Sequence, residues 1–98
     1  MYMKIHQTDI SCIVAVCDAK LIGTVLSEGN KQIDLKTHKS FYVGKEVGAD
    51  TVKKALDECS SANLVGKEAV AVAVSLELAD TGDIVYVNGI PHVQIYKL

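Results

Sequence analysis

The hydrophobic positions near the N-terminus have the spacing of β-strands. Residues 2–6 suit a short strand, and residues 12–17 form a continuous apolar run of strand length. Joined through residues 7–11, the two segments predict a hairpin. Residues 32–36 then alternate between polar and apolar positions, which predicts a further strand with one buried side.

The C-terminal end carries a second hairpin signal. Residues 84–87 and 92–96 flank the dipeptide Asn88-Gly89, the strongest short-range signal for a tight hairpin turn. Pro91 stands at the start of the second segment, where its missing N–H removes no ladder hydrogen bond. These residues predict a pair of antiparallel strands that ends the chain.

Three further segments have helical character. Asp18 can cap a helix over residues 19–26, and Asp50 can cap one that runs to about Ser60, because the apolar positions of both recur at helical spacing. Residues 67–79 alternate like a strand, but their length exceeds that of a usual strand and favours a helix. Since this segment is apolar nearly all round, we expect it to lie between the sheet and another surface.

The predicted order of elements is β-β-α-β-α-α-β-β, and it indicates an α+β fold. A mainly antiparallel sheet with helices packed on one face is the natural solution for this order. The chain has one proline, no Ser/Gly tract and no internal repeat, so we expect residues 1–98 to form a single domain. No apolar run reaches the length of a membrane span and the first residues lack a signal-peptide core, so we expect a cytoplasmic protein.

The charge of the chain argues against strong recognition of nucleic acid. Ten lysines, no arginine and twelve acidic residues give a formal net charge of −2. Arginine is the usual reader of phosphates and guanine edges, so sequence-specific recognition lacks its preferred side chain. Residues 31–54 hold six lysines against three acidic residues, and this local excess is either an ordinary solvated surface or a partner-binding face.

The motifs of several enzyme classes are absent. The sequence has no phosphate loop, no dinucleotide-binding glycine motif, no nucleophile elbow and no C-x-x-C or H-E-x-x-H metal motif. We therefore expect no cofactor and no metal, and we expect the three cysteines to be reduced core residues. Cys59 and His92 could form a nucleophile and its base only if the fold brought them together. The sequence does not decide whether the protein is an enzyme, and of the two alternatives we expect a non-enzymatic protein.

Three short segments contain aromatic or polar residues that core packing alone does not require. Residues 40–44 place the aromatic pair Phe41-Tyr42 in a polar loop between Lys39 and Lys45, where the pair either covers one end of the core or stacks on a base or ligand.

Residues 60–66, the second of these segments, lie between two predicted helices. They read either as a connection or as an anion site. In the first reading Ser61 or Asn63 satisfies helix-start amides, and Gly66 permits a positive φ or a close approach. In the second reading the vacant helix start holds a phosphate.

The third segment, residues 88–94, places His92 and Gln94 on one sheet face after Gly89. These two side chains form either the solvated side of the last strand or a ligand-facing pair.

These same segments resemble the archaeal family catalogued as domain of unknown function 424. The similarity lies in Phe41-Tyr42-x-Gly44, in Ser61 to Gly66 followed by Glu68-Ala69-Val70, and in Gly89-Ile90-Pro91-His92-x-Gln94-Ile95, and it extends over essentially the whole chain. Val43 departs from the family pattern, in which we expect a glycine. The resemblance implies no assigned activity and suggests a setting near archaeal translation genes.

The sequence leads to one main functional hypothesis and two rivals. The main hypothesis is a non-enzymatic accessory module of the archaeal translation apparatus or ribosome that binds RNA, ribosomal RNA, a translation factor or ribonucleoprotein, with no membrane contact. The expected partner-binding residues are Lys39, Phe41, Tyr42, Gly44, Lys45, Lys53 and Lys54.

One rival is a small ligand-binding protein or enzyme that uses Asn63, His92 and Cys59. The candidate ligand-binding or structural residues are Ser61, Asn63, Gly66, Gly89, Pro91, His92 and Gln94. The other rival is a homo-oligomer that pairs through the Ala/Val-rich helix or through an exposed strand edge.

Overall fold

A computed structural model describes residues 1–97 as a six-stranded sheet, a separate two-stranded hairpin and short helices. The strands are β1 (Tyr2–Gln7), β2 (Cys12–Cys17), β3 (Val25–Glu28), β4 (Lys31–Asp34), β5 (Lys45–Glu46), β6 (Ser61–Val65), β7 (Val85–Val87) and β8 (Ile90–Tyr96). The helices are α1 (Lys39–Tyr42), α2 (Ala49–Glu58) and α3 (Lys67–Ser75), with 3₁₀ turns η1 (Ala19–Leu21) and η2 (Thr81–Asp83).

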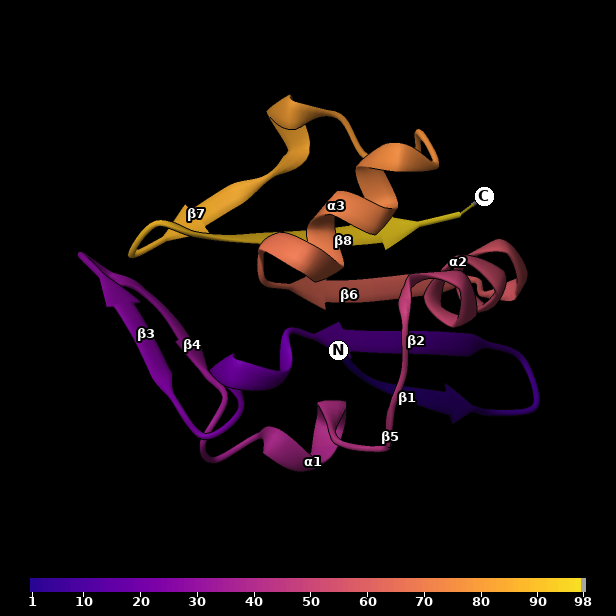
Figure 1. Cartoon of the computed structure of the whole chain (residues 1–98), viewed down its shortest axis with the longest axis horizontal. Helices are drawn as coiled ribbons and strands as arrows, with labels where there is room; N and C mark the ends of the chain where they lie inside the picture. Colours follow the sequence, from indigo (N-terminus) through magenta and orange to yellow (C-terminus); the bar gives the residue numbers. More distant parts are fainter. Residues whose placement is uncertain (98) are drawn as a thin grey trace.

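The large sheet has the strand order β5-β1-β2-β6-β8-β7, and β3 and β4 form the separate hairpin. Of the strand pairs formed by residues 1–97 in this sheet, β2 with β6 is parallel and the others are antiparallel. Figure 1 shows α2 and α3 lying together on one face of the sheet. The predicted α+β class, with a mainly antiparallel sheet and helices on one face, is confirmed. The predicted strands and helices that form follow in the predicted order, and the two segments that differ are residues 19–26 and 60–66.

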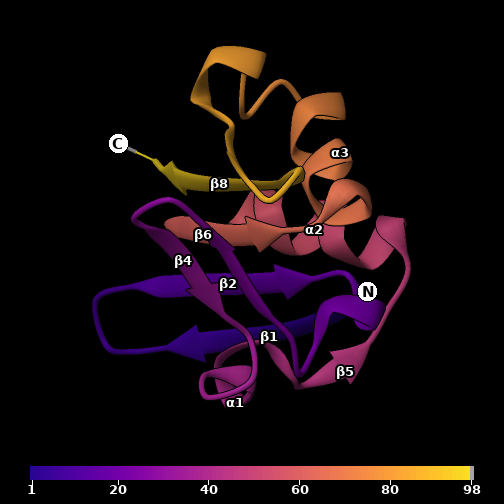
Figure 2. The same cartoon turned by 90° about the vertical axis from the view of Figure 1, so that its left-hand side faces the viewer.

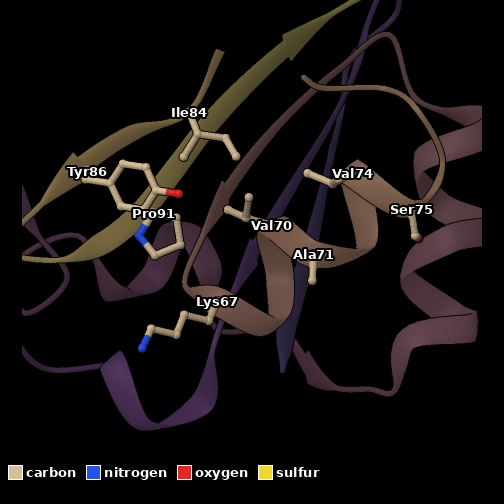
Figure 3. Close-up of a pocket in the computed structure, with 8 residues that line it drawn as sticks. All are labelled: Lys67, Val70, Ala71, Val74, Ser75, Ile84, Tyr86 and Pro91. Atoms are coloured by element: carbon tan, nitrogen blue, oxygen red, sulfur yellow. The ribbon is translucent and has the colours of Figure 1, made fainter. Parts of the chain in front are cut away.

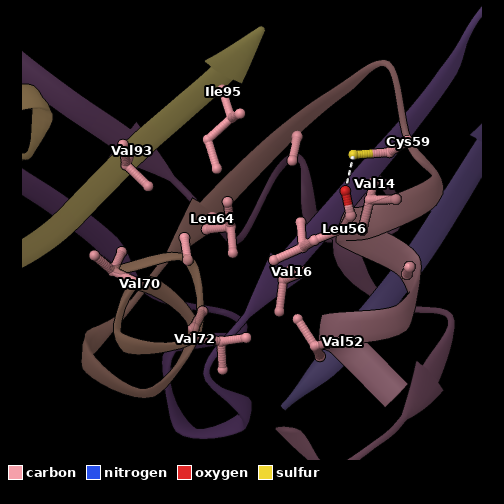
Figure 4. Packing of buried hydrophobic residues seen from close by; sticks show 14 of the residues in the cluster. Val14, Val16, Val52, Leu56, Cys59, Leu64, Val70, Val72, Val93 and Ile95 are labelled. Carbon is pink, nitrogen blue, oxygen red and sulfur yellow. Dashed lines mark hydrogen bonds between the residues drawn. The ribbon is translucent and has the colours of Figure 1, made fainter. Parts of the chain in front are cut away.

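The face under α2 and α3 carries the larger hydrophobic core. Val14 and Val16 of β2 and Leu64 of β6 alternate inward and pack against Val52 and Leu56 of α2 (Figure 4). The apolar positions of α2 are buried as its helical spacing predicts. Burial of side chains of this size contributes about 1.5–3 kcal/mol each.

The second face of the sheet is covered only in part. The β3–β4 hairpin and α1 lie on this side of the molecule (Figure 2), and they bury a second apolar cluster. That cluster contains Ala15, Cys17, Leu21, Leu26, Leu35, Tyr42, Val65 and Val87. The rest of this face carries the candidate site.

The helix predicted over residues 19–26 is wrong beyond its first turn. The 3₁₀ turn η1 ends at Leu21, Ile22 is extended, and Gly23 follows with a φ of +89°. Val25 to Glu28 then pair with Lys31 to Asp34 as an antiparallel hairpin. The apolar residues in this segment satisfy both periodicities, and the hairpin prevails because β4 supplies cross-strand partners that the local pattern does not reveal.

The connection predicted over residues 60–66 is also wrong, because residues 61–65 form the central strand β6. This strand pairs with β2 on one side and with β8 on the other. Its small and polar residues have weak strand propensity, but burial between two neighbours overrides that preference.

The helix predicted over residues 67–79 is confirmed but ends at Ser75, and Glu77 takes a φ of +60°. The segment predicted as a loop at residues 40–44 overlaps the one-turn helix α1, which ends at Tyr42. The terminal hairpin is confirmed, and Asn88 and Gly89 form its turn with φ values of 52° and 77°.

Candidate functional site

The uncovered part of the second face carries a group of polar and aromatic side chains, which we call the open sheet face. It consists of Ile13, Ser61, Asn63, His92, Gln94 and Tyr96. Ser61 lies opposite Tyr96, and Asn63 lies opposite Gln94. Gln94 is exposed and Tyr96 is 73% exposed, while the other members are half-buried.

Asn63 is the centre of this group. Its Oδ1 accepts hydrogen bonds from the Tyr42 hydroxyl at 2.9 Å and from His92 Nε2 at 3.0 Å. Because an amide oxygen only accepts, His92 carries its proton on Nε2. Burial lowers the pKa of His92, which favours the neutral ring and leaves Nδ1 as an acceptor. The Nδ2 group of Asn63 makes no hydrogen bond within residues 1–97 and is therefore a free donor.

Tyr42 holds Asn63 from the buried side of the site, and its ring is not part of the exposed surface. Its ring is 6% exposed and shares a buried cluster with Ala15 and Cys17. Burial raises the pKa of Tyr42 to about 12 and that of Cys17 to about 12, and the charge of Asp18 adds to the shift of the thiol. Neither group ionises near neutral pH, so the centre is a hydrogen-bonding array without an activated nucleophile.

An aromatic pair borders the open sheet face on the β1 side. The rings of His6 and Phe41 stack with centroids 4.5 Å apart and an interplanar angle of 16°. His6 Nε2 donates to the Phe41 carbonyl at 2.9 Å, and Lys4 Nζ donates to the Ser40 carbonyl at 2.9 Å. These contacts hold the short helix α1 against β1.

A depression of about 270 Å³ lies beside the open sheet face. It is lined by Asp83, Val85, His92, Gln94 and Tyr96. Its lining mixes a carboxylate, an imidazole, an amide and a phenol with one aliphatic side chain. This part of the surface can therefore form hydrogen bonds and stack on a flat group.

The predicted cationic surface does not form one patch. Lys39 lies on α1, Lys45 on the two-residue edge strand β5, and Lys53 and Lys54 on α2 over the opposite face. The hypothesis that Tyr42 stacks on a base is not compatible with its buried ring. Phe41 is half-buried and remains at the border of the site.

Gly44 has a structural role. A Cβ there would lie 2.5 Å from the Met3 carbonyl oxygen, so only glycine allows this approach to β1. The preceding Val43 has a φ of −80°, which any residue adopts, so its departure from the family pattern causes no strain.

Gly66 also fails to provide a phosphate site. The carboxylate of Asp18 accepts hydrogen bonds from the backbone N–H of Glu68 at 3.1 Å and of Ala69 at 2.8 Å. A protein anion therefore already occupies the start of α3, so the alternative interpretation of residues 60–66 as an anion site is wrong. Asp18 itself was expected to cap residues 19–26; it caps a helix fifty positions further along the chain.

Cys59 and His92 do not meet. Cys59 packs in the core under α2 and α3 and donates from Sγ to the Leu56 carbonyl at 3.3 Å, whereas His92 lies on the other face of the sheet. Burial raises the pKa of Cys59, which favours the thiol. The nucleophile–base pair is therefore excluded.

Pro91 lies between β6 and β7 without the loss of a hydrogen bond. Its carbonyl accepts from Gly66 N at 2.9 Å, and the carbonyl of Gly66 accepts from Val70 N at 2.9 Å. The Gly66 carbonyl, which faces position 91, therefore already has a donor and does not need the N–H that proline lacks. This agrees with the expectation from the sequence.

Sequence reasoning missed Ile13 and Tyr96 as members of the open sheet face. Tyr96 continues the two-residue alternation of His92 and Gln94, and this alternation in the sequence is sufficient to place it on the same face. Ile13 could be placed only once the partner of β2 was known.

A second concavity lies on the helix-covered side, between α3 and the β7–β8 hairpin. It measures about 500 Å³, and Ile84 and Pro91 face Val70 across it (Figure 3). Among the lining residues that belong to the described part of the chain, Lys67 alone is charged. This groove also shows that the outer side of α3 is left open, whereas the sequence predicted a second covering surface.

Two features are absent from residues 1–97. No cluster of three histidine, cysteine or acidic side chains in this part of the chain has the arrangement of a metal site. None of the helices in the same residues is long and apolar enough to cross a bilayer.

Comparisons with known proteins agree with this architecture. The crystal structure of an uncharacterized conserved protein from Methanopyrus kandleri is similar to this chain, with a TM-score of 0.80 and 29% sequence identity. The similarity covers 99% of this chain and 90% of that one. No curated protein matches the sequence. The sequence pattern described as "Protein of unknown function (DUF424)" matches residues 6–98, and the chain therefore belongs to this family.

Proposed function

We propose that this archaeal protein is a non-enzymatic accessory module of the translation apparatus, and that it binds single-stranded RNA on the open sheet face. The observation that carries the proposal is the group formed by Asn63, Gln94 and Tyr96 on the antiparallel strands β6 and β8, in the uncovered part of the second sheet face. Sheets that bind RNA use this arrangement, in which exposed aromatic rings stack on bases and neighbouring polar groups contact base edges.

The chemistry of each side chain suits a nucleobase. Asn63 offers its Nδ2 donors, His92 offers its Nδ1 acceptor, and the Gln94 amide offers both a donor and an acceptor. The exposed ring of Tyr96 can stack on a base, which typically contributes about 1–3 kcal/mol. The stacked pair of His6 and Phe41 can extend the contact toward β1.

The charge distribution determines how strongly this binding should depend on salt. The net charge is −2, and Lys53 and Lys54 lie over the opposite face, so few phosphates can be neutralised at the site. Binding should therefore depend mainly on bases and only weakly on salt. The affinity for free RNA should be low, and a ribonucleoprotein partner would supply the remaining contacts.

We propose a non-enzymatic function because the thiol and the phenol near the open sheet face stay protonated. The phenol of Tyr42, which donates to Asn63, and the thiol of Cys17, which lies in the same buried cluster as Tyr42, have raised pKa values, and both remain neutral at physiological pH. A neutral His92 beside them lacks an activated partner.

The test is fluorescence anisotropy with labelled homopolymeric RNA oligonucleotides. The variant Tyr96→Ala should weaken binding about 10-fold or more, the loss expected for one stacked base. Tyr86→Ala is the matched control, because Tyr86 is also exposed but lies on the helix-covered side, and it should bind as the wild type does.

Two results would overturn the proposal. One is wild-type protein that binds none of the four homopolymers and sediments away from ribosomal particles in extract of its own cells. The other is an equal loss of binding in the Tyr96 and Tyr86 variants, which would place the contact elsewhere.

A further inference from the structure

The outer edge of β8 is paired along only part of its length. On one side β8 pairs with β6 over residues 92–96, and on the other it pairs with β7 only over residues 90–92. Within residues 1–97, no strand lies beside the outer edge from residue 93 to residue 96.

The backbone hydrogen bonds show which groups this edge presents. Pro91 O accepts from Gly66 N, and Lys97 N donates to Ser60 O, both at 2.9 Å, so the odd-numbered residues of β8 point toward β6. The N–H and C=O groups of Gln94 and Tyr96 consequently point outward, past the end of β7. No backbone partner for them exists in the described chain.

The two edges of the sheet differ in how they resist pairing. The opposite edge, β5, has two residues, both charged, and glycines at positions 44 and 48 flank it. Short charged strands of this kind are a usual protection against pairing. Residues 93–96, Val-Gln-Ile-Tyr, carry no charge and no proline, and strand-forming side chains predominate among them.

We propose that this edge pairs with the same edge of a second copy of the chain. The spacing of these backbone groups is self-complementary. In an antiparallel pair centred on Ile95, Gln94 of each copy lies opposite Tyr96 of the other. The backbone N–H and C=O groups of both residues then point toward the partner strand. A two-fold axis perpendicular to the sheet relates the copies, so the contact closes and does not propagate.

The surroundings leave room for this contact. The depression lined by Asp83, Val85, His92, Gln94 and Tyr96 borders the unpaired part of β8. The two sheets become one, and the open sheet faces of both copies stand side by side. This inference goes beyond the proposed function and holds whether or not the face binds RNA.

The test is analytical ultracentrifugation without RNA, from micromolar to millimolar protein. The wild-type mass should double with concentration. Gln94→Pro removes an outward N–H and should remain monomeric, whereas Gln94→Thr changes the side chain, keeps the N–H and should still dimerise.

A charge-swap pair keeps the test independent of any folding defect in the proline variant. Gln94→Lys with Tyr96→Lys places like charges opposite each other only in the dimer and should give a monomer. Gln94→Lys with Tyr96→Glu places opposite charges there and should restore the dimer. A wild type that is monomeric at every concentration, or a doubly lysine-substituted protein that dimerises normally, would overturn the inference.

Discussion

The carboxylate of Asp18 occupies the space that a side chain at position 66 would need. A Cβ on Gly66 would lie 2.2 Å from Asp18 Cγ, and Gly66 itself has a φ of +110°. Asp18 is 1% exposed and binds two N–H groups at the start of α3. The end of β2, the end of β6 and the start of α3 are therefore joined at one point.

Substitution at this junction should be costly. We expect Gly66→Ala to lower the free energy of unfolding by about 1–3 kcal/mol, because the new methyl group clashes and the backbone is strained. Gly82→Ala is the control, since a Cβ there meets no atom within 4 Å. Urea denaturation should separate the two variants, and equal midpoints would contradict the clash.

The core under the helices gives a second stability prediction. Leu56 is fully buried between α2 and the sheet, so Leu56→Ala should cost about 2–5 kcal/mol. Ile10, which is 95% exposed, is the matched control, and Ile10→Ala should change stability by about 0.5 kcal/mol or less. An unchanged denaturation midpoint for Leu56→Ala would show that this packing is wrong.

Stability should fall as the pH is lowered through the range in which His92 titrates. Burial lowers the pKa of His92 below its ordinary 6.5, so the unfolded chain binds its proton more readily than the folded chain does. The contribution of neutral His92 is complete above 6.5 and is lost as the pH falls through the lower folded pKa. We expect NMR titration to place this pKa below 6.5 in the native protein. His92→Gln should flatten that part of the stability profile, and a profile identical to that of the wild type would argue against the assignment.

The buried thiols should be inert in the native state. Cys17 is completely buried with a pKa of about 12, and burial also raises the pKa of Cys59. A thiol reagent should modify both residues far more slowly in the folded protein than after denaturation, which serves as the internal control. Rapid labelling of Cys59 under native conditions would reopen a catalytic role for it.

The elements that the sequence alone predicted are those with local signals. The periodicity of Val52, Ala55 and Leu56 predicted α2, and Asn88-Gly89 predicted the terminal hairpin, because the residues that stabilise these elements are near neighbours in the chain. The alternation of His92 and Gln94 also placed them on one face. These signals were sufficient for the α+β class.

The tertiary structure decided what depends on distant partners. Residues 61–65 are a strand because β2 and β8 enclose them, and Asp18 caps α3 because the sheet brings residues 18 and 66 together. The grouping of Asn63 with Tyr42 and His92 arises in the same way, since each comes from a different element. No periodicity encodes such pairings, because they depend on strand order and on which surfaces remain uncovered after the core has formed.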